Sequence, residues 1–246
     1  MKILNGLALA ALVVSLAACG DKDSGNVVAP TGAPVAAVAA PAGTTWADTV
    51  ATTPEGGFVM GNPKASIKVA EYASYSCSHC RDFAAESAEE LKALVNSGKV
   101  SYELRNYVRD PLDMAITLLV RCGGKEPFFP LSEQFFGNQA AMFDKAQAMG
   151  DAAYQAAMAQ PPQQRFVTLA AATGLIEFAK QRGIAENQAR QCLADSGEAE
   201  KLAKGVQAAT AQYNISGTPT LLINGAVVEN TTTWTAMRAK IKEAGA

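Results

Sequence analysis

The stretch IKVAEYASYSCSHC, residues 67–80, decides the fold. Its first part, residues 67–72, is a β-prone run that follows a turn-like Gly-Asn-Pro, so it predicts a strand. After Cys80, apolar residues recur at helical spacing through residues 83–95, until a Ser-Gly pair stops the pattern. The sequence therefore predicts a strand that delivers two cysteines to the N terminus of a helix.

The two cysteines differ in their place on this helix. Cys77 is predicted at the N terminus, where unpaired backbone N–H groups and the positive end of the helix dipole stabilise a thiolate. Cys80, one turn in, can close a disulfide with Cys77 or resolve a mixed disulfide. His79 can support the thiolate by charge and hydrogen bonding, which makes the disulfide more oxidising. We expect Cys77 to be the nucleophile of an electron-accepting site that works without a cofactor.

Other uses of two cysteines at this spacing lack the residues that they need. Covalent haem attachment requires His directly after the second Cys, where this chain has Arg81. A structural zinc site requires two more close ligands, but Cys122 and Cys192 stand alone and His79 is the only histidine. A Ser-His-Asp or Cys-His hydrolase would have to borrow His79 from between the cysteines. We therefore expect redox chemistry and no metal site.

The segment from Glu71 to Cys80 resembles the DsbA family, in which a strand Glu lies six residues before the first Cys of a C-x-H-C motif. Ser78 stands where DsbA itself most often has Pro, and the two middle residues tune the redox poise. The resemblance implies that Glu71 is a buried carboxylate that relays the proton of Cys80. The alternative for Glu71 is a charged strand residue turned to solvent.

A distant second segment, ISGTPT at residues 215–220, resembles the thioredoxin-fold loop whose proline is cis and faces the cysteine pair. The resemblance implies that Pro219, which lacks an N–H, and the backbone of Thr218 receive an extended substrate. The alternative is an ordinary trans turn before a strand. Thr before this Pro departs from DsbA and is more similar to the isomerase branch.

The remaining pattern predicts an α/β protein with a thioredoxin fold and an inserted helical subdomain, as in the DsbA family. The predicted domain spans residues 56–246, with the helical insertion at about 111–195. Around it the sequence predicts a second strand over 99–108, a helix over 198–213, a strand after Pro219, an Asn-Gly hairpin turn at 224–225, a strand at 226–228 and a final helix from residue 234.

The first eighteen residues are typical of an export signal, with a charged start and an apolar core too short to span a membrane. The run Leu-Ala-Ala-Cys ending at Cys19 resembles the bacterial lipobox, which implies that Cys19 carries lipid and becomes the mature N terminus. The alternative is an ordinary secretory signal with a chance cysteine. The residue after Cys19 is Gly20 and not Asp, which favours sorting of the lipoprotein to the outer membrane.

Residues 19–55 are rich in Ala, Pro, Gly and Val and have no sustained helical or strand period. This composition predicts a tether without packed structure, which holds the domain away from the membrane surface. An interaction segment of the same composition is the alternative.

Two cysteines remain once Cys19 is lipidated and the pair in the motif is accounted for. Cys122 and Cys192 both lie in the predicted helical insert, and in an oxidising compartment we expect them to pair. Such a bridge would close a loop of about 70 residues. The alternative is two buried free thiols.

The composition and motifs together predict a lipid-anchored enzyme on the periplasmic side of a bacterial membrane. The chain has a net charge of −2 and an isoelectric point near 5.6, without basic clusters, so we expect no nucleic acid partner. We expect a monomeric thiol:disulfide oxidoreductase, an oxidase rather than an isomerase or reductase, with reduced or misoxidised exported proteins as substrates and a membrane or periplasmic redox partner. The alternative is a thioredoxin-fold lipoprotein that handles copper or acts as a chaperone, with the cysteines as soft ligands.

Overall fold

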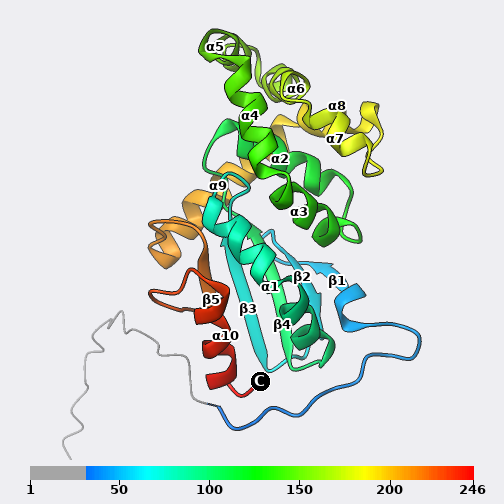
Figure 1. Cartoon of the computed structure of the whole chain (residues 1–246), viewed down its shortest axis with the longest axis vertical. Coiled ribbons are helices and arrows are strands. Elements are labelled where there is room, and N and C mark those ends of the chain that lie inside the picture. The colour runs from blue at the N-terminus through cyan, green and yellow to red at the C-terminus, as the bar shows by residue number, and fades with distance from the viewer. Residues whose placement is uncertain (1–31) are drawn as a thin grey trace, which may run out of the picture.

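The computed structural model describes residues 32–246, so the predicted signal peptide (1–18) and the predicted lipidation site Cys19 lie outside the described residues. Six strands form one sheet in the spatial order β1-β2-β4-β3-β5-β6 (Figure 1). The strands are β1 (Val50–Thr52), β2 (Phe58–Gly61), β3 (Ile67–Ala73), β4 (Val100–Asn106), β5 (Thr220–Ile223) and β6 (Ala226–Val227).

The centre of the sheet is the predicted strand-helix-strand unit. β3 and β4 run parallel, from Ile67 opposite Val100 to Ala73 opposite Asn106. α1 (Ser78–Asn96) joins them and packs its apolar side chains against one face of the sheet. Because a central strand is covered on both faces, all of β3 except Lys68 is buried.

Alternate side chains of β3 enter two different apolar clusters, as the period of two along a strand requires. Val69 belongs to the large cluster that includes α1 and the final helix, α10 (Trp234–Glu243). Ala70 and Tyr72 belong to a smaller cluster with Ala209 of α9 (Ser196–Tyr213). The sheet is therefore the middle of three layers, with α1 and α10 on one face and α9 on the other.

The C-terminal strands bring the loop at residues 215–219 beside the turn that carries the two cysteines. β5 pairs antiparallel with β3 and places Thr220 opposite Tyr72. β5 and β6 are joined by Asn224 and Gly225, whose φ values of 51° and 85° are those that an Asn-Gly hairpin turn needs. The segment before β5, which holds Pro219, thus lies next to the turn that leads from β3 into α1.

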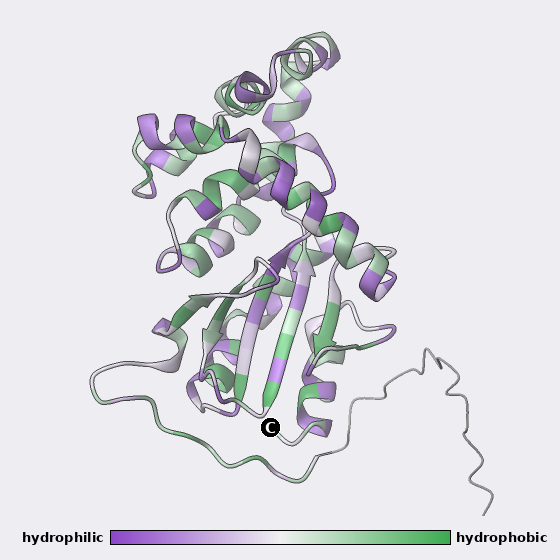
Figure 2. Ribbon diagram, turned by 180° about the vertical axis from the view of Figure 1, so that it is seen from behind, coloured by the Kyte–Doolittle hydropathy of each residue, from purple (hydrophilic) through white to green (hydrophobic). Residues whose placement is uncertain are grey.

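A group of helices lies between β4 and α9 in the sequence. Figure 1 shows these helices at the end of the molecule opposite the C terminus, and Figure 2 shows frequent polar residues on them and hydrophobic residues along the strands. The helices are α2 (Pro111–Cys122), α3 (Phe128–Gly137), α4 (Gln139–Met149), α5 (Asp151–Met158), α6 (Pro162–Ala172), α7 (Leu175–Lys180) and α8 (Glu186–Leu193). Within residues 32–246, no helix has the length and apolarity needed to cross a membrane.

The prediction of an unpacked tether over residues 19–55 is wrong for its second half. Gly32 N donates to Glu243 O at 3.0 Å, and Val38 N donates to Ser97 O at 2.9 Å. β1 lies in the same range and pairs with β2. These two strands were not predicted because three or four residues are too few for an alternating pattern to be recognised.

Other boundaries differ by a few residues. The strand predicted over 99–108 is observed at Val100–Asn106. The helix predicted over 198–213 begins earlier, at Ser196, because the Asp195 side chain caps it by accepting a hydrogen bond from Glu198 N.

Candidate active site

Cys77 lies where β3 passes into α1. β3 ends at Ala73, residues 74–76 form a turn, and Cys77 is the N-cap of α1 with an extended backbone. Cys80 follows in the first turn of the helix, and both cysteines are free thiols in this structure. The fold therefore brings the pair to the helix N terminus that the sequence predicts.

The surroundings of Cys77 favour its thiolate. The pKa of Cys77 is lowered to about 4, first by a hydrogen bond from the Cys80 side chain and, against the effect of burial, by backbone N–H groups of Cys80 and His79. The Sγ atom lies 3.1 Å from Thr218 O, to which the protonated thiol donates. At neutral pH, Cys77 is therefore the ionised and reactive member of the pair.

Cys80 has the opposite character. Its side chain is fully buried, and burial raises its pKa, with further contributions from Cys77 and from the carboxyl of Glu71. A thiol that keeps its proton while its neighbour is a thiolate suits the resolving role. The asymmetry between the two sulfurs thus follows from their places on one helical turn.

Glu71 lies beneath the cysteines on β3 and is only 2% exposed. Its carboxyl accepts a hydrogen bond from the hydroxyl of Tyr102 on β4. Burial raises the pKa of Glu71 to about 8, although the bond from Tyr102 acts in the opposite direction. The alternative of a solvent-facing strand residue does not describe this side chain.

The loop before β5 lies against Cys77, and both line one cleft. The Thr218–Pro219 peptide bond is cis, so the alternative of a trans turn does not describe this loop. Thr218 Oγ1 is buried and has no hydrogen-bond partner among the described residues. The cleft of about 410 Å³ is lined by Ser76, Cys77, Ser78, His79, Tyr107, Arg109, Ser216, Gly217 and Thr218.

The imidazole of His79 lies differently from what the sequence suggests. The residue is exposed, and among the described residues its side chain makes no hydrogen bond to Cys77. The contact that His79 gives to the Cys77 sulfur comes from its backbone N–H. Any contribution of the imidazole therefore acts through its charge. Within residues 32–246, no cluster of three or more His, Cys, Asp or Glu side chains could hold a metal ion.

Several known proteins are similar to this chain over most of its length. A family model described as thioredoxin matches residues 53–243, which includes the sheet from β2 onward and the helical insert. The chain belongs to the thioredoxin family. The crystal structure of a protein-disulfide isomerase from Novosphingobium aromaticivorans is 33% identical, with a TM-score of 0.70, over 75% of this chain and 94% of that chain.

Two further relatives of this thioredoxin-family protein are more distant. The structure of Wolbachia pipientis α-DsbA1 is 20% identical with a TM-score of 0.62 over 79% of this chain and 94% of that chain, which shows a DsbA-like fold. A predicted protein-disulfide oxidoreductase of Rickettsia bellii is 23% identical over 72% of this chain. The chain spans 60% of the length of that Rickettsia protein.

A second pair of cysteines lies in the helical insert of this thioredoxin-family protein. Cys122 at the end of α2 and Cys192 in α8 form a disulfide, with an S–S distance of 2.03 Å. The alternative of two free thiols is not what the structure shows. The bridge joins segments 70 residues apart, so it ties the two ends of the insert together.

The sequence did not identify three buried polar residues that contact the site. Tyr102 donates to Glu71, whereas Asp113 and Gln139 bond to the turn before Cys77. Asp113 had a weak signal, because Asp110 and Pro111 predict a helix start and Asp113 lies in the first turn of that helix. Gln139 had none, because its partners lie more than 60 residues away in the sequence.

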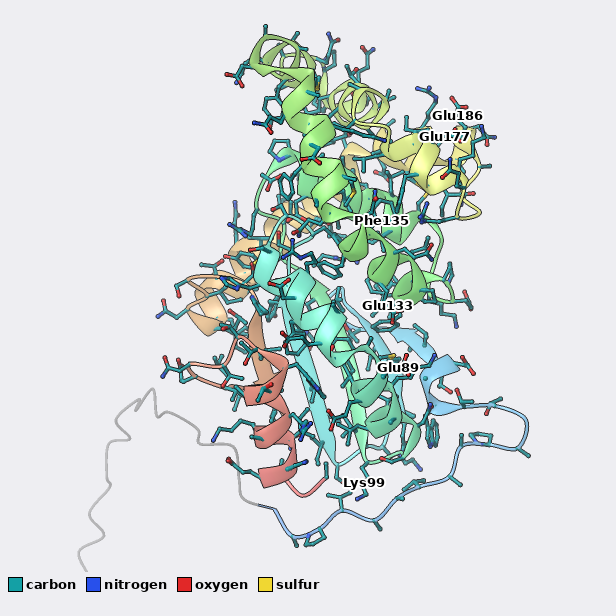
Figure 3. The ribbon with its side chains drawn as sticks, viewed as in Figure 1. Glu89, Lys99, Glu133, Phe135, Glu177 and Glu186 are labelled. Carbon is teal, nitrogen blue, oxygen red and sulfur yellow. A yellow bond between two sulfur atoms is a disulfide. The ribbon has the colours of Figure 1, made fainter. Side chains whose placement is uncertain are left out.

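A second hollow lies between α1, α3 and β4. This cavity of about 390 Å³ is lined mostly by apolar side chains, together with Lys92, Glu133 and other charged residues. Figure 3 shows Glu133 of α3 on the same side of the molecule as Glu89 of α1, and burial and repulsion from Glu89 raise the pKa of Glu133. Tyr102 also lines the cavity, and its hydroxyl donates to Glu71. The Tyr102 side chain therefore connects the cavity to Glu71.

Proposed function

We propose that this protein is a thiol:disulfide oxidoreductase that forms or exchanges disulfides in exported proteins through Cys77 and Cys80. The observation that carries the proposal is the asymmetry of the pair. Cys77 lines an open cleft and has a pKa of about 4, whereas Cys80 is fully buried and has a raised pKa. One sulfur is thus suited to meet substrate and the other to resolve the mixed disulfide.

In the oxidising direction, a substrate thiolate attacks Cys77 Sγ of the oxidised pair. A substrate–Cys77 disulfide forms as the Cys77–Cys80 bond breaks, and Cys80 leaves as a thiolate that takes a proton from Glu71. A second substrate thiolate then attacks the substrate sulfur of the mixed disulfide, and Cys77 leaves as a thiolate. Two electrons pass from substrate to the pair, which a membrane or periplasmic redox partner would reoxidise.

The low pKa of Cys77 supports oxidation over reduction as the physiological direction. A leaving thiolate of low pKa departs readily, and its stability in the reduced state makes the corresponding disulfide a stronger oxidant. Glu71 supports the same direction, since a carboxyl with a pKa of about 8 holds a proton at neutral pH and can pass it to Cys80.

We place substrate in the cleft beside the cis peptide of Thr218 and Pro219. The approach of Cys77 Sγ to Thr218 O at 3.1 Å supports this, since an extended peptide bonded to Cys77 would run past the Thr218 backbone. Thr218 Oγ1 adds a buried hydroxyl without a partner among the described residues. These groups can bond to a peptide backbone and need not recognise one side chain, which suits an enzyme with many substrates.

The proposal also includes export and anchoring, which rest on residues 1–31. Cleavage at the predicted lipobox would leave Cys19 as the lipidated N terminus, on the periplasmic side of the membrane, with the outer membrane favoured. Labelling with a radioactive fatty acid should mark the wild-type protein and leave a Cys19→Ala variant unlabelled. Equal labelling of both would contradict the anchor.

Trapping the mixed disulfide tests the proposed chemistry. A Cys80→Ser variant mixed with a disulfide-bonded peptide should accumulate a peptide linked to Cys77, because the resolving sulfur is gone. Cys77→Ser should form no such species, whereas replacement of both Cys122 and Cys192 by Ser should leave trapping unchanged. Equal trapping by the Cys77→Ser and Cys80→Ser variants would contradict the assigned roles.

A further inference from the structure

The turn that carries Cys77, residues 74–77, is held by buried side chains of the helical insert. Across the turn itself, Cys77 N donates to Ser74 O at 3.1 Å, and Ser76 N donates to Ser74 Oγ at 3.1 Å. These bonds do not involve the N–H of Tyr75 or the carbonyls of Tyr75 and Cys77, so these three groups need partners outside the turn. A buried backbone group without a partner is costly, so what satisfies these three groups determines how firmly the turn is held.

Gln139, the first residue of α4, satisfies both carbonyls. Its side chain is 2% exposed, and Nε2 lies 2.7 Å from Tyr75 O and 2.9 Å from Cys77 O. Because both neighbours can only accept, the amide must present its NH₂ group to them. Cys77 O also accepts from Arg81 N at 3.1 Å, which is the first backbone bond of α1. Gln139 therefore bonds to the carbonyl from which the helix begins.

Asp113 of α2 holds the other side of the turn. Its buried carboxylate accepts from Tyr75 N at 2.9 Å and from Ser74 Oγ at 2.6 Å. The same carboxylate accepts from Arg109 N at 3.0 Å, in the segment that lines the cleft. Gln139 thus donates to two C=O groups of the turn, and Asp113 accepts from one of its N–H groups. The helical insert therefore bonds to both kinds of backbone group.

We propose that Gln139 is a positioning residue for Cys77, through which the helical insert fixes the first turn of α1 around the nucleophilic sulfur. The proposal rests on the proposed function, in which Cys77 is the nucleophile. Its physical basis is the source of thiolate stabilisation, which includes backbone N–H groups of His79 and Cys80 in that first turn. When the starting carbonyl loses its bond to Gln139, the turn loosens, and its N–H groups point less steadily at the sulfur.

The test is the pKa of Cys77 in a Gln139→Met variant, which keeps the length of the side chain and removes its donors. The rate at which iodoacetamide alkylates Cys77 in the reduced full-length protein, followed by mass spectrometry against pH, reports the thiolate directly. We expect the pKa to rise by about one unit, which at pH 4 lowers the alkylation rate about fivefold. A folded variant with the wild-type pKa would overturn the proposal and leave Gln139 a merely structural residue.

The matched control is Gln134→Met on α3. Gln134 is exposed and donates to Pro130 O of its own helix at 3.1 Å, so its loss should leave the alkylation profile unchanged. If Gln139→Met does not fold, Gln139→Glu, which has the shape of glutamine, is measured in its place. Burial keeps this carboxyl protonated at the pH where Cys77 titrates, so it has one O–H donor in place of two N–H donors; the pKa of Cys77 should rise by less than in Gln139→Met, and an unchanged value would equally overturn the proposal.

This measurement is independent of disulfide exchange. If the pKa rises as expected but the wild-type protein exchanges no disulfides, the positioning role stands and the proposed function fails. If the wild-type protein exchanges disulfides and Gln139→Met leaves the pKa unchanged, the proposed function stands and the positioning role fails.

Discussion

The protein contains two pairs of cysteines with opposite states. Cys77 and Cys80 are three residues apart in the motif, lie on one helical turn and are free thiols. Cys122 and Cys192 are 70 residues apart, come from α2 and α8 and form a disulfide. The first pair belongs to the sheet domain beside the cleft, and the second ties together the helical insert.

The difference shows that environment assigns the role of each cysteine. A hydrogen bond from the Cys80 side chain and, to a smaller extent, backbone N–H groups lower the pKa of Cys77 to about 4, which stabilises the reduced pair. For the Cys122–Cys192 bridge the main contribution is the loop that it closes, because a cross-link over 70 residues restricts the unfolded chain. We infer that the first pair changes its redox state during the reaction and that the second keeps its bond.

The largest expected effect separates the two pairs by activity. Replacing Cys77 by Ser should lower the rate of disulfide exchange with a model peptide by about 10³-fold or more, because the nucleophile is lost. Replacing Cys122 by Ser should change that rate by less than about threefold. Stopped-flow or gel-shift kinetics measure both, and equal losses would remove the distinction between the pairs.

The next effect separates the pairs by stability. With Cys122 and Cys192 both replaced by Ser, the free energy of unfolding should fall by about 4 kcal/mol, since the unfolded chain regains the freedom of a 70-residue loop. Urea unfolding of the wild-type protein and the double variant, with Cys77 and Cys80 as free thiols in both, measures this difference. A loss below about 1 kcal/mol would mean that the bridge does not stabilise the insert, and the double variant should still exchange disulfides.

A smaller effect concerns the carboxyl beneath the reactive pair. The pKa of Glu71 is raised to about 8 in the folded protein, so its contribution to stability is complete below about pH 4 and is lost as pH rises through 8. Relative to wild type, Glu71→Gln should therefore gain about 3 kcal/mol in free energy of unfolding between pH 6 and pH 9.

The control for Glu71 is an exposed carboxylate of the insert. A hydrogen bond from Lys180 lowers the pKa of Glu177, so Glu177→Gln should show no such gain between pH 6 and pH 9. Figure 3 shows Glu177 far from the sheet. Parallel stability curves for wild type and Glu71→Gln would mean that Glu71 does not hold its proton in the folded protein.

The smallest effect concerns His79. Because its imidazole is exposed and makes no hydrogen bond to Cys77 among the described residues, only its charge can favour the thiolate. His79→Ala should lower the reduction potential of the cysteine pair by about 30 mV, which is about 1.4 kcal/mol. Equilibration with glutathione measures this. A drop several times larger would show direct contact between the imidazole and the sulfur.

The sequence predicted the parts of the site that are encoded locally. Cys77, Cys80 and Glu71 lie in one stretch whose strand and helix periods fix their relative places, and Pro219 precedes a strand that pairs with it. Contacts between distant segments could not be predicted, because no periodicity links Gln139 to a carbonyl 62 residues away. For the same reason, the Ala/Pro-rich composition of residues 32–52 did not indicate that the sheet domain would bind them.

The most direct test of the account is the equilibrium reduction potential of the Cys77–Cys80 pair, titrated against glutathione with Cys122 and Cys192 replaced by Ser. Because the thiolate of Cys77 is stabilised by its neighbours, we predict a potential well above that of glutathione, so that the protein donates disulfides. A potential well below that of glutathione would contradict this account and make the protein a reductase.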